Sequence, residues 1–339
     1  MWQRSARGPY VETLLFTLSA LVLFLTGIGL GFFLVPLQAL ASRRGFGWLS
    51  VGAVLFLAVI ALVPPFSAAG PAAQALPMVP RAIVLAFGGV SVAGILLVNL
   101  PLRRPPRAVV RLVGAAALVG AVAAALEIVR APVFVQLVSA LGSYVSQVFS
   151  AVMVAPGTDG GAAGLLAQPG DAATVRALVD VTFPRCLAAG YLVELSFSWW
   201  LGQLLGRRRS VYGESPSGFR LSSFRLESWW LWPLIAGGAA VLADLFLGLS
   251  GDGLSILAYA GWNIGFGVLF VFGLQGMAIV MFLFEKYQVP RFLWFLLLAG
   301  LAVVVSRGRG VFFVLIIPVL GIAENWIRFR IPRRAAPTE

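Results

Sequence analysis

The sequence predicts an all-α fold, a polytopic bundle of transmembrane helices. Of its 339 residues, 60% are hydrophobic and 11% are charged, with a mean hydropathy of +0.95, whereas soluble domains carry about 25% charged residues. Residues 253–284 contain no charge, and at about 1.5 Å per residue a helix of this length exceeds the hydrocarbon thickness of a bilayer. Arginines lie in short runs between apolar stretches, which is typical of the loops of a membrane protein.

The first apolar run, residues 13–41, is interrupted by Gly27, Gly29 and Gly31 and then by Pro36. Glycine and proline break or kink helices, so we predict two short helices, about 13–27 and 30–41, that form a hairpin. Both ends of a hairpin face the same side of the membrane. The arginines at 4, 7, 43 and 44 then all lie in the cytoplasm, as the positive-inside bias requires.

Three further spans are expected at about 48–66, 81–100 and 109–129, with an uncharged outer loop at 67–80 and a basic inner loop at 101–108. Residues 131–154 carry a stripe of serine and glutamine along one helix face. We interpret this segment as an interfacial or re-entrant helix on the outer side, because a full span would place Arg207, Arg208 and Arg209 outside. A full span whose stripe faces a cavity is the alternative.

The basic segment 207–228 is the expected cytoplasmic connection between an N-terminal membrane half, 1–206, and a C-terminal half, 229–330. The first half ends with a span at about 186–205. The second half has predicted spans at about 229–248, 253–284, 292–305 and 311–327, followed by a cytoplasmic tail at 331–339. The expected total is about ten spans, as in a polytopic inner-membrane-type protein, with both termini inside.

Glu194 is the strongest candidate for a functional residue. It lies midway along an otherwise uncharged predicted helix, where an ionised acid costs about 2.5–3.5 kcal/mol. Its candidate partners are Tyr191 and Ser198, one turn away on either side, and the polar stripe at 136–150. Glu194 could bind a substrate or a proton, or it could make a structural hydrogen bond between helices.

Asn263 and Gln275 are the strongest polar groups of the uncharged segment 253–284. They lie among glycines, where a neighbouring helix can approach closely and an amide can bond across the contact, so both are candidate substrate-binding residues. Arg307 and Arg309, flanked by glycines in a predicted outer loop, are candidate contacts for an anion or a lipid.

The remaining charged residues are expected at the membrane interfaces. Asp244, the pair Glu127 and Arg130, and the pair Glu324 and Arg328 are interpreted as interfacial ion pairs. Arg328 and Arg330 are interpreted as snorkelling anchors.

Several functional classes are not expected from this composition. The chain has no histidine and one cysteine, Cys186, so we expect no metal site and no cofactor. It has no recognisable catalytic or nucleotide-binding motif, so it is not expected to be an enzyme; an intramembrane enzyme that uses Glu194 is kept as an alternative. The net charge of +12 is explained by topology, so membrane lipids rather than nucleic acid are the expected partners.

One resemblance comes from the second half of the chain. Asn263, the run Leu274-Gln275-Gly276-Met277-Ala278, and the closing run from Gly321 through Glu324 to Arg330 resemble the YybS-like family of bacterial membrane proteins, whose function is unknown. The family motif would comprise Gly276, Gly321, Glu324 and Arg330, with Glu324 standing where the family usually has Asp.

This family is distantly similar to the substrate-binding S components of energy-coupling-factor transporters. The resemblance therefore implies a helical subunit that binds a small molecule or lipid and depends on a separate ATPase module. The Ala-x-x-x-Ala contact strip expected on the first helix of an S component is absent from residues 13–28. The rival hypothesis is a scaffold or assembly subunit that holds other membrane proteins.

Overall fold

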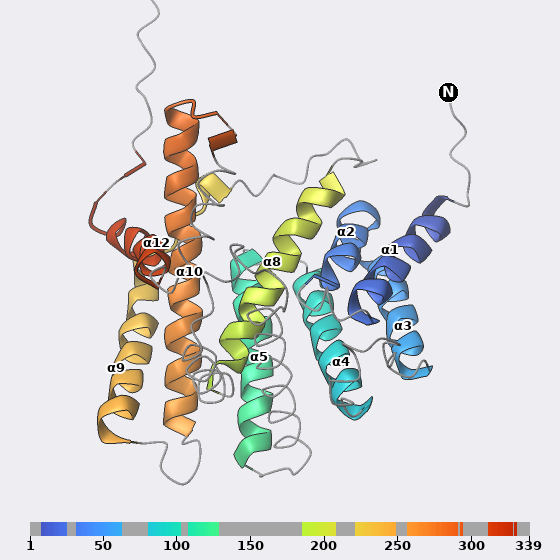
Figure 1. Cartoon of the computed structure of the whole chain (residues 1–339), viewed down its shortest axis with the longest axis horizontal. Helices are drawn as coiled ribbons and strands as arrows, with labels where there is room; N and C mark the ends of the chain where they lie inside the picture. The colour runs from blue at the N-terminus through green and yellow to red at the C-terminus, as the bar shows by residue number, and fades with distance from the viewer. Residues whose placement is uncertain are drawn as a thin grey trace, which may run out of the picture. The chain divides into compact units, whose positions relative to one another are not determined.

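The computed structural model describes the chain in segments: residues 8–25, 32–62, 81–102, 108–128, 185–207, 221–248, 256–290, 292–293, 311–327 and 329–330. Within these segments there are nine α-helices and no strand (Figure 1). The all-α prediction is therefore confirmed for the described part of the chain. The helices belong to two compact units, α1 to α8 and η1 to α12.

The first unit begins with the predicted helix pair, α1 (Gly8–Leu25) and α2 (Leu34–Arg44). Nε of Arg44, at the end of α2, lies 2.9 Å from Oε2 of Glu12, near the start of α1, so the two helices are antiparallel, as a hairpin requires. Pro36 lies within the second helix, as in the predicted range of 30–41. It lies in the first turn of α2, where the backbone N–H would have no helical partner in any case.

The short helix α2 is surrounded by its neighbours. Seven of its eleven residues are buried, including the amide of Gln38. At about 1.5 Å per residue α2 is about 16 Å long, too short to cross a bilayer. Gly45, with φ of +85°, forms the whole link to α3, a backbone conformation that favours glycine. We conclude that α2 is the packing centre of the first unit.

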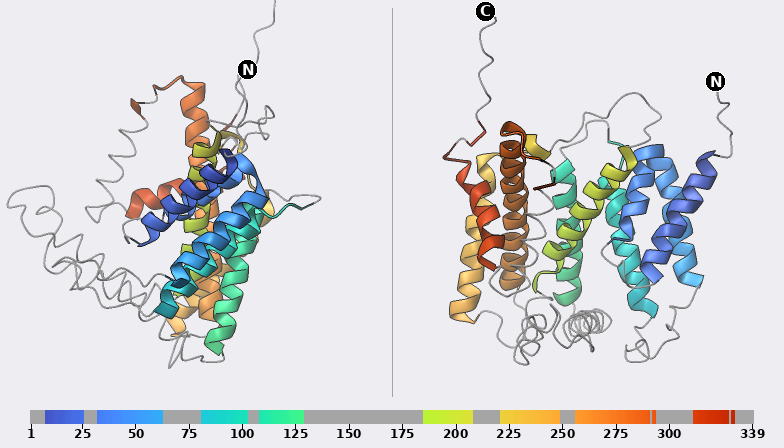
Figure 2. Two further views of the ribbon diagram at one scale, coloured as in Figure 1. Left: turned by 90° about the vertical axis from the view of Figure 1, so that its right-hand side faces the viewer. Right: turned by 45° about the horizontal axis from the view of Figure 1, so that its top comes forward.

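The other helices of this unit pack against α2 or against a helix that contacts it (Figure 2). They are α3 (Phe46–Leu62), α4 (Arg81–Val98), α5 (Ala108–Ile128) and α8 (Leu187–Arg207). The rings of Phe24, Phe33, Phe56 and Phe87 meet with centroid distances from 4.8 to 6.3 Å and join α1, α2, α3 and α4. Each helix lies within a few residues of its predicted span.

The second unit is built on the long helix α10 (Ile256–Lys286). α9 (Leu231–Leu247) and α12 (Val311–Ala323) both pack against it. Two short 3₁₀ turns, η1 (Leu221–Ser223) and η2 (Ser228–Trp230), precede α9, and η1 also lies against α10. The uncharged segment is therefore the core helix of this unit, as predicted.

Four described helices are long and apolar enough to cross a membrane: Gly8–Leu25, Ala108–Ala125, Ser228–Leu247 and Ile256–Lys286. α3 and the described part of α4 are shorter apolar helices. α8 has the required length, but Glu194, Gln203 and its serines lower its hydropathy. On α9 the side chains of Trp232, Phe246 and Leu247 are more than 70% exposed, which suits contact with lipid.

Several predicted elements lie wholly or mostly outside the described residues. They are the outer loop at 67–80, the helix at 131–154, the span at 292–305 beyond its first two residues, the loop with Arg307 and Arg309, and the tail at 331–339. The count of ten spans stays a prediction for this reason.

Candidate functional site

The first candidate site lies where α4 and α8 meet. Gly94 of α4 leaves room for the ring of Tyr191, because a Cβ on Gly94 would overlap the Tyr191 hydroxyl. That hydroxyl donates a hydrogen bond of 2.7 Å to the backbone oxygen of Val90. The close contact fixes α8 against α4 one turn from Glu194.

Glu194 faces α4 beside this contact. The hydroxyl of Ser91, which shares a face of α4 with Gly94, interacts with the Glu194 carboxyl. Yet Oε1 of Glu194 and the hydroxyls of Ser91 and Ser198 are all buried without a hydrogen bond of normal geometry. A buried polar group without a partner costs about 1–3 kcal/mol. Three such groups lie on two packed helices, so their oxygen atoms could form further bonds to a ligand.

Sequence reasoning found part of this site. It named Glu194, Tyr191 and Ser198, and the structure places all three on one side of α8. The hydroxyl of Tyr191, however, is bonded to Val90 rather than to Glu194. Ser91 was missed, because nothing in the local sequence shows which residue of α4 faces α8.

A second polar contact in this unit was also missed. Gln38 of α2 and Asn99, just after α4, exchange two amide hydrogen bonds of 3.2 and 2.6 Å. On α8, a Cβ on Gly202 or Gly206 would lie 2.5 Å from the side chain of Gln38 or Ser42. The spacing Gly202-x-x-x-Gly206 is typical of close contacts between membrane helices and was available as a sequence signal. The glycine contacts hold α8 against α2. The amides of Gln38 and Asn99 are bonded to each other, so this contact is not a candidate binding site.

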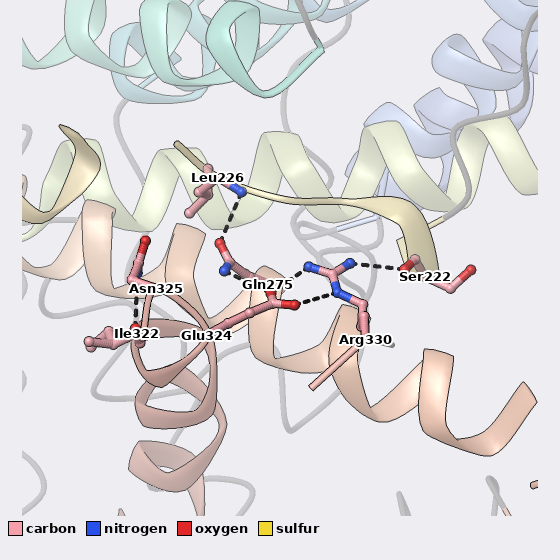
Figure 3. Close-up of polar contacts among 7 residues, drawn as sticks. All are labelled: Ser222, Leu226, Gln275, Ile322, Glu324, Asn325 and Arg330. Atoms are coloured by element: carbon pink, nitrogen blue, oxygen red, sulfur yellow. Dashed lines mark hydrogen bonds and ion pairs between the residues drawn. The ribbon is translucent and has the colours of Figure 1, made fainter. Parts of the chain in front are cut away.

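The second unit contains a buried network around Glu324, which follows the last turn of α12 (Figure 3). Oε2 of Glu324 accepts a hydrogen bond of 2.9 Å from Nε2 of Gln275 on α10. Both carboxylate oxygens accept hydrogen bonds from Arg330, at 2.6 Å from Nε and 2.5 Å from Nη2. Glu324 is 3% exposed and Gln275 is 1% exposed.

The same network reaches the segment before α9. Oε1 of Gln275 accepts a hydrogen bond of 3.0 Å from the backbone N–H of Leu226. Nη1 of Arg330 donates one of 2.9 Å to the backbone oxygen of Ser222. The network therefore ties residues 222–226 to α10 and to the end of α12 (Figure 3).

Glycines bring the two helices of this network together. A Cβ on Gly276 would overlap the backbone oxygen of Ile317, and one on Gly321 would overlap that of Phe272. α10 and α12 are thus in backbone contact at the point where Gln275 reaches Glu324. This is the arrangement predicted for α10, glycines with an amide bonding across the helix contact.

The predictions for three charged residues, Glu324, Arg330 and Asp244, are wrong. Glu324 is buried rather than interfacial, and its partner in the structure is Arg330; Arg328, the expected partner, lies outside the described residues. Arg330 is not a snorkelling anchor, because its guanidinium is bonded to Glu324 and Ser222. The spacing of four residues between Glu324 and Arg328 predicts a pair on one helix face. The helix ends at Ala323, however, so this spacing does not apply.

Asn263 and Asp244 lie apart from the network around Glu324. The amide of Asn263 donates to the backbone oxygen of Tyr259, one turn earlier on α10, and three turns separate Asn263 from Gln275. Asp244 is buried, not interfacial, and accepts a hydrogen bond of 2.9 Å from Nε1 of Trp262. Arg307 and Arg309 lie outside the described residues.

The two clusters differ in what they can do chemically. In the network of the second unit, the amide of Gln275 and the carboxylate of Glu324 are bonded within the protein, as expected of a structural joint. The cluster of Glu194, Ser91 and Ser198 has one buried acid and two hydroxyls with free capacity. It is therefore the better candidate for a binding site.

No protein-family model, curated protein or solved structure matches the chain.

Proposed function

We propose that this chain is a polytopic membrane protein that binds a small molecule between α4 and α8, using Glu194 as the recognition group. In this proposal it is a transporter-like subunit that resembles the S components in having no ATPase of its own. The four helices of membrane-spanning length and composition support the membrane location. The ten spans, the bacterial cytoplasmic membrane and the cytoplasmic termini are further parts of the proposal.

The proposal rests on Oε1 of Glu194, a carboxyl oxygen that is buried without a hydrogen bond. Acids within membrane helices are rare and costly, and they commonly mark substrate, ion or proton paths. Structural acids are bonded within the protein, as Glu324 is in the second unit. Glu194 has a buried oxygen without a hydrogen bond and lies beside two serine hydroxyls in the same state.

Coupling to energy would require another protein. The sequence has no nucleotide-binding motif, so active uptake would depend on a separate ATPase module, as the resemblance to the YybS-like family also implies. The first helix lacks the Ala-x-x-x-Ala strip with which an S component contacts its ATPase module. In this chain, such a module would therefore contact other residues.

The alternatives have less support. A scaffold would present its small-residue faces to partners, but Gly261 and Gly265 of α10 contact α9, and Gly276 contacts α12. An intramembrane enzyme would need a second acid or base near Glu194, and the described groups beside it are hydroxyls.

The test is the small-molecule content of the full chain purified in lipid nanodiscs. We compare wild type with Glu194→Gln, which keeps size and hydrogen-bonding capacity but cannot ionise. Mass spectrometry should find a small molecule that is retained by wild type and lost from Glu194→Gln. Glu285→Gln, at an exposed acid near the end of α10, is the matched control and should retain it.

Thermal unfolding separates a binding role from a structural one. Glu194→Gln should unfold within a few degrees of the ligand-free wild type, because the amide oxygen can still accept a hydrogen bond from the Ser91 hydroxyl. Retention of the same small molecule by Glu194→Gln would remove Glu194 from the site. A stoichiometric protein partner with no bound small molecule would favour the scaffold instead.

A further inference from the structure

The described groups around Glu194 indicate which charge the site accepts. The site offers one carboxylate oxygen and the hydroxyls of Ser91 and Ser198. Carboxylate oxygen attracts positive charge, and hydroxyl oxygens can join it as neutral ligands. An anionic ligand would meet like charge at Glu194.

No described cation neutralises Glu194 from a neighbouring helix. The helices packed against α8 are α2, α4 and α5, and their described charged side chains are Arg43, Arg44 and Arg111. Arg43 donates to the backbone oxygen of Leu205, Arg44 pairs with Glu12, and Arg111 donates to the backbone oxygens of Val98 and Leu100. The other titratable group facing Glu194 is Tyr191 on α8 itself, whose hydroxyl donates to Val90.

The donor set also limits the kind of cation. The three groups are all oxygen donors, which suit hard cations and the proton rather than soft metals. Divalent cations in proteins are generally held by more than one carboxylate. Among the described residues, no group of three or more His, Cys, Asp or Glu could hold a metal ion. A single carboxylate balances a single positive charge.

We propose that Glu194, Ser91 and Ser198 bind one small monovalent cation, a proton or an alkali ion such as Na⁺, between α4 and α8. This inference rests on the proposed function, which makes Glu194 a binding group, and it names the charge class of what binds there. Loading the cation neutralises the acid within the helix pair. A transported molecule whose binding depends on that neutralisation would be coupled to the cation gradient.

Two measurements on the purified full chain test the proposal and show whether the bound cation is a proton or an alkali ion. Infrared difference spectroscopy detects a protonated carboxyl group, and equilibrium binding of ²²Na⁺ detects an alkali site. We expect at least one signal in wild type and its loss in Glu194→Gln. If the proton is the ligand, the carboxyl band is present and Na⁺ does not change it. If Na⁺ is the ligand, binding is saturable, and any carboxyl band decreases as Na⁺ is added.

Matched variants assign the signal to the site. The double variant Ser91→Ala, Ser198→Ala should weaken cation binding about tenfold or more, since two ligands are removed. Ser196→Ala, on the opposite face of α8, and Glu285→Gln should leave the signal unchanged. A far-ultraviolet circular dichroism spectrum equal to that of wild type shows that each variant is folded.

Absence of both signals in wild type would overturn the proposal, as would a signal that persists in Glu194→Gln. If an anionic or neutral molecule co-purifies in a Glu194-dependent way while neither cation signal is seen, the proposed function survives and this inference fails. If the cation signal is present but no small molecule is ever retained, the inference stands and the proposed substrate-binding role fails.

Discussion

The ion pair between Glu324 and Arg330 shows how a buried charge is tolerated in this protein. Its carboxylate accepts hydrogen bonds from Gln275 and from two nitrogens of Arg330. The pair between Glu12 and Arg44 has the same chemistry, but its side chains are 30% and 25% exposed. Water can replace a lost partner at the exposed pair and cannot do so at the buried one, so the two pairs should differ in their effect on stability.

We therefore expect Glu324→Gln to destabilise the protein by about 3–5 kcal/mol, because it leaves the Arg330 guanidinium without its counter-charge in a buried site. Glu12→Gln is the control and should cost about 1 kcal/mol or less. Unfolding in detergent, followed by tryptophan fluorescence, gives both values. Equal losses from the two substitutions would contradict this account.

At the scale of helices, packing depends on a few glycines where backbones touch. On α10, Gly261 lies against Ala240 and Gly265 against Gly237, both on α9, while Gly276 lies against Ile317 on α12. One helix thus uses glycines at successive turns to contact two neighbours. Gly273 lies on the same helix but makes only an ordinary contact of 3.6 Å with Pro318.

We predict that Gly276→Ala destabilises the second unit by about 1–3 kcal/mol, because the added methyl group overlaps the backbone of α12 and the helices must separate. Gly273→Ala should be neutral or stabilising, since alanine is favoured over glycine within a helix by roughly 0.5–1 kcal/mol. Thermal unfolding of the two variants side by side is the measurement. A Gly276→Ala protein as stable as wild type would show that α10 and α12 are not in backbone contact.

At the scale of the whole molecule, arginines collect at the ends of helices of the first unit. Arg43 caps the carboxyl end of α8 at Leu205, and Arg111 caps the carboxyl end of α4 at Val98. Cations at these ends favourably meet the negative end of the helix dipole. Asn99 bonds to Gln38 and Arg43 to Leu205, so the carboxyl ends of α4 and α8 both lie against α2. That the loops after these two helices are cytoplasmic stays a prediction.

The topology prediction can be tested by labelling single cysteines in intact cells. After Cys186→Ser, cysteines placed at Ser215 or Ala335 should not react with an impermeant maleimide until the membrane is opened. A cysteine at Ala72, in the predicted outer loop, should react at once. Outside reactivity at 215 or 335 would invert the assignment, and with it the direction in which any substrate moves.

The positions of the helices were determined by the sequence itself. Predominantly apolar runs with few charges form helices in a membrane, because every backbone polar group then bonds within its own segment. This local requirement placed α3, α4, α5, α8, α9, α10 and α12 within a few residues. It also drew attention to Glu194, since an acid in such a run is visible without any knowledge of its neighbours.

The partners of the polar groups were decided only by the tertiary structure. Ser91 lies about a hundred residues from Glu194 along the chain, and Gln275 lies 49 residues from both Leu226 and Glu324. Local spacing favoured Arg328 over Arg330, because it assumed that the helix continues. Which side chains meet depends on how α12 crosses α10 at Gly276 and Gly321 and on how Gly94 admits Tyr191. These are close packing contacts between segments that are distant in the sequence. The hydrophobic periodicity within one helix does not show which residues of another helix it will meet.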